Sequence, residues 1–254
     1  MSDHILSSHE NGVATLRFNR PDKKNAITGD MYAALAAGID KANADDDVNV
    51  ILFLGSPGVF TSGNDIADFM QVAMTGERSS MAVFDFLERI IMAPKPMIAG
   101  VDGMAIGVGC TMLLHCDHVI AGENTIFKTP FVDLGLVPEA GSSLIGPEVM
   151  GHHRAFEFFA MGATFSTEQA SASGFVNHVV PSDEVDAYAQ HAAQQLAAKP
   201  KEALKISRDL IRGDRTPVLE RMREESVLFG ERLSSDEARQ AFAAFMSRGQ
   251  KKAS

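Results

Sequence analysis

The 254-residue chain has no tryptophan and only two cysteines, Cys110 and Cys116. Two cysteines are too few for a disulfide framework, so a reducing compartment is the default expectation. Basic residues are also scarce, since 23 Lys and Arg stand against 33 Asp and Glu, a formal net charge of −10 at pH 7. An acidic chain without a basic block argues against nucleic acid or an anionic membrane as its main partner.

Long apolar runs and targeting signals are missing as well. The longest nearly apolar stretch, from Met97 to Leu114, is interrupted by Asp102 and several glycines, which a membrane-spanning helix rarely tolerates. The first residues, MSDHILSS, do not read as a signal peptide, and the last four, KKAS, are not a peroxisomal address. We therefore expect a cytoplasmic protein that does not insert into a membrane.

What the chain does have is an alternation of strand-like and helix-like segments. An Asn11-Gly12 turn before the alternating Val13–Phe18 predicts a hairpin. The apolar run 48–54 is typical of a strand that is covered on both faces. Other segments follow in the same order: a helix capped by Thr28 with Met31, Leu35 and Ile39 on its apolar face, a helix over 80–92 with Phe84, Leu87 and Ile91 on one side, and strands at Met97–Val101, 119–120 and 125–127. This order indicates an α/β fold with a largely parallel core.

The last quarter of the chain is helical in composition. Helices are expected near 183–198, 201–212, 217–232 and 235–248, after a short helix that starts at a candidate capping box, Ser166 to Gln169. We therefore divide the chain into a core, residues 1–182, and a helical assembly region, residues 183–254.

Two glycine-containing loops are candidates for ligand binding. Gly63 and Asn64 tolerate unusual backbone angles and would present a free N–H, or else the loop is an ordinary one in which Asp65 caps a helix. The glycines of 103–109 precede a helix expected near Cys110, whose N-terminus would face an anion. The alternative there is a tight packing turn, and the glycine spacing is not that of a dinucleotide-binding loop.

Glu139 lies among apolar and small residues, after a proline and before an expected helix. In an apolar pocket its pKa would be raised, which suits proton transfer near neutral pH. The alternative is a solvent-exposed glutamate at a helix start. His115 and His118 flank Cys116-Asp117, but this spacing matches no common zinc site, and we expect no metal.

Taken together, these blocks resemble the crotonase (enoyl-CoA hydratase/isomerase) superfamily. The resemblance runs over nearly the whole chain, from Asn19-Arg20-Pro21 with Asn25-Ala26, through TSGNDI and 96–109, to the helical tail. It implies a ClpP/crotonase-like spiral of ββα units with a helical C-terminal trimerisation region, assembled as a homotrimer or a dimer of trimers. It also implies an acyl-CoA thioester substrate, with coenzyme A as part of that substrate and no separate cofactor.

By the same resemblance, the backbone N–H groups of Asn64 and Val108 form an oxyanion hole. Such a pair stabilises the enolate-like oxygen that forms when a proton leaves the carbon beside the thioester. Lys23 and Lys24 are candidates for the phosphates of coenzyme A, although they read equally well as solvated loop lysines. The residues expected to bind the coenzyme A part are Lys23, Lys24, Asn25, Ala26, Ser62, Gly63, Asp65, Ile66 and Gly107.

Positions at which this sequence differs from the family pattern indicate which reaction of the family to expect. Hydratases carry two glutamates, at positions that are Thr111 and Phe131 here, and neither of these side chains exchanges a proton at neutral pH. What remains is Glu139, in TPFVDLGLVPEAGSS, which is similar to the monofunctional, peroxisomal-type Δ3,Δ2-enoyl-CoA isomerases. The resemblance implies that Glu139 moves a proton from C2 to C4 while Asn64 and Val108 hold the dienolate oxygen.

The acyl chain needs an apolar pocket. Flexible methionines suit a pocket that accepts varied chains, and Phe131 would help to exclude water. The expected lining residues are Met70, Met74, Met81, Phe84, Leu87 and Phe131. Two alternatives to the isomerase stay open: a hydratase-like crotonase that acts on another acyl-CoA, and a non-catalytic acyl-CoA-binding protein.

Overall fold

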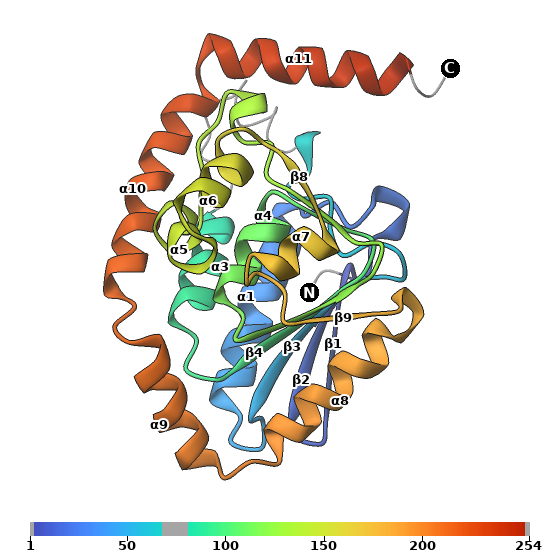
Figure 1. Cartoon of the computed structure of the whole chain (residues 1–254), viewed down its shortest axis with the longest axis vertical. Helices are drawn as coiled ribbons and strands as arrows, with labels where there is room; N and C mark the ends of the chain where they lie inside the picture. Colours follow the sequence, from blue (N-terminus) through green and yellow to red (C-terminus); the bar gives the residue numbers. More distant parts are fainter. Residues whose placement is uncertain (1–2, 68–80, 252–254) are drawn as a thin grey trace.

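The computed structural model describes residues 3–67 and 81–251. Strands and helices alternate up to Val180, and helices alone follow (Figure 1). The strands are β1 (Ile5–Glu10), β2 (Val13–Phe18), β3 (Val50–Leu54), β4 (Met97–Val101), β5 (Met104–Ile106), β6 (His118–Gly122), β7 (Ile126–Lys128), β8 (Thr164–Ser166) and β9 (His178–Val180).

The helices cluster around these strands and at the end of the chain. The α-helices are α1 (Gly29–Ala44), α3 (Met81–Met92), α4 (Val108–Thr111), α5 (Ser142–Met150), α6 (His152–Phe159), α7 (Thr167–Ala172), α8 (Val185–Ala197), α9 (Lys201–Arg212), α10 (Thr216–Leu233) and α11 (Asp236–Lys251). Short 3-10 turns are η1 (Pro21–Lys23), η2 (Met112–His115), η3 (Val132–Leu134) and η4 (Ser182–Glu184).

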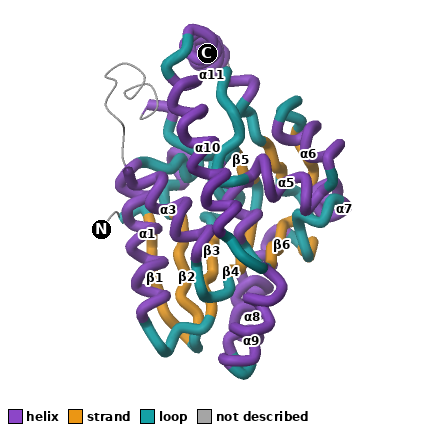
Figure 2. The backbone as a smooth tube through the Cα atoms, turned by 90° about the vertical axis from the view of Figure 1, so that its left-hand side faces the viewer, coloured by secondary structure: helices purple, strands orange, loops and turns teal. Residues whose placement is uncertain are grey.

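A six-stranded sheet of order β1-β2-β3-β4-β6-β9 forms the centre of the molecule. The predicted hairpin joins β1 and β2, which pair antiparallel, and both turn residues have positive φ angles, 51° at Asn11 and 76° at Gly12. Every other neighbouring pair is parallel, and β1 to β4 lie side by side in Figure 2. The prediction of a largely parallel core is thus confirmed.

The structure also contains a second, three-stranded sheet of order β5-β7-β8. The strand β4 of the large sheet is followed by β5 of the small sheet and then by α4, and β6 is likewise followed by β7 and later by α5. In both sheets the equivalent strands pair parallel. This repetition of two strands and a helix is the spiral of ββα units that the family resemblance implies.

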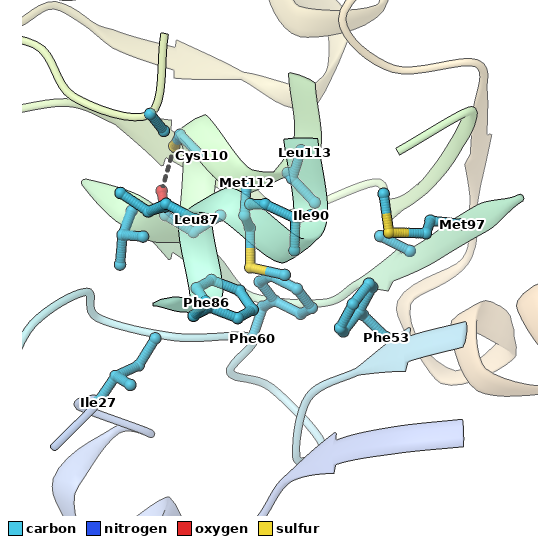
Figure 3. Packing of buried hydrophobic residues seen from close by; sticks show 14 of the residues in the cluster. Ile27, Phe53, Phe60, Phe86, Leu87, Ile90, Met97, Cys110, Met112 and Leu113 are labelled. Carbon is cyan, nitrogen blue, oxygen red and sulfur yellow. Dashed lines mark hydrogen bonds between the residues drawn. The ribbon is translucent and has the colours of Figure 1, made fainter. Parts of the chain in front are cut away.

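The large sheet is covered on both faces, which explains its continuous apolar strands. On one face, α8 packs its alanines against Val50, Leu52 and Ile98. On the other face, α1 and α3 belong to the larger hydrophobic core, where Phe53, Phe60 and Phe86 meet Met112 (Figure 3). Alternating residues along a strand such as β3 pack against opposite cores, so the sheet is a rigid base for the loops at its edge.

The predicted helices agree with the structure, and their ends differ by at most three residues. Thr28 caps α1, and Ser166 and Gln169 form the expected capping box of α7. The helix expected near Cys110 begins at Val108, and β3 begins at Val50 rather than at residue 48. One prediction was wrong: Phe84 does not share the buried face of α3 with Leu87 and Ile91, because its side chain is 38% exposed.

The C-terminal helices follow the outside of the molecule (Figure 1). The first of them, α8, packs on the sheet, whereas α10 contacts α3 and α5, and α11 contacts η3. The division at residue 182 stays a prediction, but these helices cover the region in which the candidate site lies. No helix among the described residues has the length and apolar character that crossing a membrane requires.

Candidate active site

Glu139 lies in the loop between η3 and α5, and its side chain is only 7% exposed. Of the two alternatives that the sequence left open, the buried carboxyl is therefore the one that the fold produces. The loop is made by backbone angles that few residues adopt: the next two residues, Ala140 and Gly141, have φ angles of +63° and +71°. A left-handed alanine is strained by about 1–3 kcal/mol, and such strain is often found at functional sites.

The hydroxyl of Thr111, in α4, donates a hydrogen bond to Oε1 of Glu139. Thr111 is fully buried, and Phe131, which occupies the other position where hydratases carry a glutamate, is 5% exposed. The first of the two hydratase positions is thus beside Glu139, and it supplies a neutral hydrogen-bond donor instead of a second acid. This leaves Glu139 as a carboxyl group in largely apolar surroundings.

Burial raises the pKa of Glu139 from 4.5 to about 7. The hydrogen bond from Thr111 acts in the opposite direction, because it favours the charged form, and the negative charge of Glu225 raises the pKa further. A carboxyl group with a pKa near 7 is divided between its two protonation states at neutral pH, so it can both accept and return a proton.

Two backbone segments that the sequence singled out lie side by side. Thr61 and Ala105 form a parallel bridge, and the N–H of Ile106 donates to the carbonyl of Thr61 at 3.0 Å. Asn64 and Val108 each lie three residues beyond this bridge along their own segments. Gly63 makes this approach possible, since a Cβ there would lie 2.8 Å from the carbonyl oxygen of Ile106.

The N–H groups of Asn64 and Val108 are the pair that the family resemblance assigns to an oxyanion hole. Val108 is the first residue of α4, where a helix leaves its N–H groups without partners inside the helix. Among the hydrogen bonds between described residues, neither N–H serves as a donor. Two such donors from neighbouring segments are suited to an oxyanion that develops between them.

Tyr32, in α1, contacts the candidate site, and the sequence analysis missed it. Its hydroxyl donates to Oδ1 of Asn64 at 2.5 Å, and its ring packs on Phe86 at 5.5 Å between centroids. Burial raises the pKa of Tyr32 well above 10, and the charge of Glu139 adds to this rise, so Tyr32, Asn64 and Glu139 share one region. The signal was present as a tyrosine beside Met31 on the buried face of an amphipathic helix.

The turn that includes Lys24 and Asn25, which is expected to bind coenzyme A, packs against the segment 59–62. Asn25 is fully buried, and its amide donates to the carbonyls of Val59 and Phe60 at 3.0 Å, which indicates a structural task. The N–H of Ser62 donates to the carbonyl of Lys24 at 2.9 Å. These contacts hold the turn close to the segment that presents Asn64.

The other residues that the sequence analysis assigned to coenzyme A binding have varied surroundings. Asp65 pairs with Arg20 at 2.6 Å, and the same guanidinium donates to the carbonyl of Ala26 at 3.0 Å. Asp65 also accepts from the N–H of Ala67, as the capping alternative for that loop expects. Ile66 packs on the large core, and Gly107 is the residue before α4, with its N–H bonded to Lys128. Lys23 and Lys24 are exposed, and their contact with phosphates stays a prediction.

The expected acyl-chain residues divide into three groups. Met70 and Met74 lie outside the described residues, and Met81 is the first residue of α3. Phe84 is partly exposed on α3, whereas Leu87 is buried in the core near Phe86 and Met112 (Figure 3). The acyl pocket therefore stays a prediction, supported on its inner side by apolar side chains.

His115 is a core histidine in the structure. It is buried, and its Nε2 lies 2.8 Å from the carbonyl oxygen of Ala140, next to Glu139. Glu225, in α10, was also missed: it accepts hydrogen bonds from the N–H groups of Gly141 and Ser143. No local pattern predicts this contact, because its partners lie more than eighty residues apart in the sequence. Among the described residues, no group of three His, Cys, Asp or Glu side chains is arranged to hold a metal ion.

Comparisons with known proteins agree with this geometry. Residues 8–253 match the enoyl-CoA hydratase/isomerase family. Enoyl-CoA delta isomerase 2 of Rattus norvegicus is 32% identical over 252 residues, which cover 97% of this chain and 64% of that protein. The 1,2-epoxyphenylacetyl-CoA isomerase of Escherichia coli K12 is 34% identical over 226 residues, which cover 87% of this chain and 86% of that protein. The structure of OdaA from Pseudomonas aeruginosa has a TM-score of 0.91 and 41% identity, and it covers 96% of this chain and 99% of its own.

This chain spans less than two thirds of the length of the rat isomerase. The names of these relatives describe different reactions, and a shared fold can support several chemistries. The family itself rests on a match along almost the entire chain. Together with the fold, the paired N–H groups and the buried glutamate, this match leads to the conclusion that the protein belongs to the enoyl-CoA hydratase/isomerase family.

Proposed function

We propose that this protein is a Δ3,Δ2-enoyl-CoA isomerase, which moves a double bond in an unsaturated fatty acyl-CoA. The observation that carries the proposal is the buried carboxyl group of Glu139, whose pKa is raised to about 7 and whose hydrogen-bond partner is the neutral Thr111. One carboxyl group that both accepts and donates near neutral pH meets the needs of isomerisation. The rat relative, whose name is enoyl-CoA delta isomerase 2, supports the same choice.

In the proposed reaction, the carboxylate of Glu139 takes a proton from C2 of a 3-enoyl thioester. The electrons of the C2–H bond move toward the thioester carbonyl and form a dienolate, whose oxygen accepts hydrogen bonds from the N–H groups of Asn64 and Val108. The protonated Glu139 then donates the same proton to C4, and the double bond comes to lie between C2 and C3. Because coenzyme A is part of the substrate and only a proton moves, the reaction needs no separate cofactor.

The environment of Glu139 is suited to this transfer. Apolar side chains exclude water, which would otherwise exchange with the proton or add to the double bond. Phe131 is buried where a hydratase carries an acid, and Thr111 holds one carboxylate oxygen while the other is left for the substrate. Hydration requires a group that activates water and a group that protonates the second carbon. A hydratase-like reaction is thus the weaker candidate.

We further propose that the protein assembles as a homotrimer or a dimer of trimers, with α9 in the contact. Three large apolar side chains of this helix face outward, with Ile206 57%, Leu210 80% and Ile211 85% exposed. Exposed apolar side chains gathered on one element mark an interaction surface more often than a solvent-facing one.

The proposed activity can be tested with two substrates at one enzyme concentration. With a trans-3-enoyl-CoA, the absorbance of the conjugated thioester should rise as the double bond moves into conjugation. With a trans-2-enoyl-CoA, the same absorbance should stay constant, whereas a hydratase would make it fall. A fall at a rate similar to the rise would reject the isomerase in favour of a hydratase. Binding of both esters without any change would favour a non-catalytic acyl-CoA-binding protein.

A further inference from the structure

The loop that carries Glu139 depends on contacts from outside itself. Ala140 and Gly141 both adopt left-handed backbone angles, which a loop keeps only where its surroundings hold it. A Cβ on Gly141 would lie 2.8 Å from Cγ1 of Val218 and 3.0 Å from its carbonyl oxygen, so α10 packs directly on this residue. The helix α10 belongs to the C-terminal region for which the sequence suggested only assembly.

Glu225 of α10 makes the strongest of these contacts. Its Oε2 accepts from the N–H of Gly141 at 2.6 Å, and its Oε1 accepts from the N–H of Ser143 at 2.9 Å. The side chain is 4% exposed. These N–H donors and the nearby Arg221 favour the carboxylate, against the burial that raises the pKa of Glu225. A single side chain thereby holds Gly141, the residue before α5, and Ser143 in the first turn of α5.

A second set of contacts reaches the same loop from the N-terminal end of α10. The N–H at Nε2 of His115 donates to the carbonyl of Ala140 at 2.8 Å, and the Arg215 guanidinium, just before α10, donates to Nδ1 of His115 at 3.1 Å. Burial and the neighbouring Arg215 lower the pKa of His115 to about 3, so the ring is neutral. This protonation agrees with the contacts, since one ring nitrogen donates and the other accepts.

We propose that Glu225 is a positioning residue for Glu139. It holds the loop that carries Glu139, and it places a negative charge behind this base. The inference rests on the proposed role of Glu139 as the proton carrier. It extends the site to α10, whose residues lie far from Glu139 in the sequence.

The charge of Glu225 matters because the other described groups that face Glu139 are neutral. Tyr32 of α1 and Cys110 of α4 both have pKa values that burial raises, so they keep their protons. His115 of η2 is uncharged, and Thr111 does not ionise. Arg221 lies beside Glu225, and Arg215 lies behind His115. A carboxylate facing a second carboxyl group disfavours its ionisation, which makes Glu139 a stronger base.

The test separates geometry from charge with two substitutions at one position. Glu225→Gln removes the charge and keeps one carbonyl oxygen as an acceptor, whereas Glu225→Asp keeps the charge and shortens the reach to the loop. Glu231→Gln is the matched control, because it removes the same charge from an exposed position of the same helix. The pKa of Glu139 is measured by infrared titration of its carboxyl band, assigned by the loss of that band in Glu139→Gln.

We expect Glu225→Gln to lower the pKa of Glu139 by about one unit and to move the acid limb of kcat/KM to lower pH by the same amount. We expect Glu225→Asp to leave this pKa near the wild-type value and to lower kcat by about tenfold, with a smaller change in KM, because the base is misplaced. Glu231→Gln should resemble the wild type in every measurement.

An unchanged pKa and an unchanged kcat in Glu225→Gln would overturn the inference. If that variant does not fold, Glu225→Asp decides, since a wild-type kcat with the shortened side chain contradicts a positioning role. The infrared titration does not depend on turnover. A wild-type enzyme that isomerises nothing would therefore reject the proposed function, while the titration would still show whether Glu225 acts on Glu139.

Discussion

At the scale of single residues, Glu139 links activity to stability. Burial raises its pKa from 4.5 to about 7, so the folded protein holds the proton more tightly than the unfolded chain does. The stabilisation from this proton is complete below the unfolded pKa and is lost as the pH rises through about 7. Above that pH the folded protein contains an ionised, buried carboxylate, which costs on the order of 3 kcal/mol. A residue selected for stability alone would not be a glutamate.

This cost leads to a first prediction, for the variant Glu139→Gln. At pH 8 we expect it to be more stable than the wild type by about 2–3 kcal/mol, because it keeps the shape and the contact with Thr111 without the charge. At pH 5, where Glu139 is protonated in the folded protein, the two should have nearly equal free energies of unfolding. Urea unfolding at both pH values measures the difference. A gain of the same size at pH 5 and pH 8 would contradict the raised pKa.

Thr111 acts on Glu139 in the direction opposite to burial, because its hydrogen bond stabilises the carboxylate. We predict that Thr111→Val, which keeps the shape and removes the hydroxyl, moves the acid limb of kcat/KM to higher pH. Thr111→Ser keeps the hydroxyl and should leave the limb close to that of the wild type. A limb that moves to lower pH in the valine variant would show that the hydroxyl does not donate to the base.

At the scale of elements, the site depends on how closely two segments approach. Gly63 has a φ angle of +85°, and a Cβ there would lie 2.8 Å from the carbonyl oxygen of Ile106. The parallel bridge between Thr61 and Ala105 lies beside this approach, between the segments that lead to Asn64 and Val108. The glycine therefore supports the proposed oxyanion site through its backbone, although it has no side chain.

We predict that Gly63→Ala lowers kcat by tenfold or more, roughly what a displacement of a catalytic group by about 1 Å costs. The matched control is Gly58→Ala, because Gly58 has a similar φ angle of +78° but no atom within 4 Å of the position a Cβ would occupy. Both variants carry the strain of a left-handed alanine, so their difference isolates the contact with Ile106. Equal loss of kcat in the two variants would reject this account of Gly63.

Local patterns predicted the elements well but reached only part of the site. The apolar run of β3, the Thr28 cap and the capping box at Ser166 each act over a few residues, so the sequence displays them directly. The burial of Glu139 was left open, because spacing alone does not tell what covers a loop. Tyr32 and Glu225 were missed because their partners come from other elements. The buried face of α3 was misjudged at Phe84, where the tertiary arrangement overrides helical spacing.

At the scale of the whole molecule, the helical tail has two tasks in this account. Glu225 in α10 and Arg215 just before α10 hold the loop of Glu139 from within one chain, Arg215 through His115. In α9, by contrast, Ile206 and Leu210 lie one helical turn apart and point outward. The proposed assembly surface on α9 and the contacts of α10 with the loop of Glu139 thus lie on consecutive helices.

We predict that the double variant Ile206→Glu with Leu210→Glu sediments as a 27.3 kDa monomer, whereas the wild type sediments as a trimer or a dimer of trimers. Two charges in an apolar contact remove the gain from burial and add a desolvation cost. Lys205→Glu, at an exposed polar position of α9, serves as the control and should assemble normally. A wild type that is monomeric at micromolar concentration would contradict the assembly proposal.

The central claim is that one carboxyl group, Glu139, carries the proton. The most direct measurement is kcat for isomerisation of a trans-3-enoyl-CoA by Glu139→Gln, together with the Kd of the product ester from calorimetry. Glu148→Gln, which removes an exposed carboxylate from α5, is the control. The account predicts that kcat falls by about a thousandfold while Kd changes little, because the acid–base group is lost and the binding surfaces remain. A Glu139→Gln enzyme that turns over within about tenfold of the wild type would contradict it.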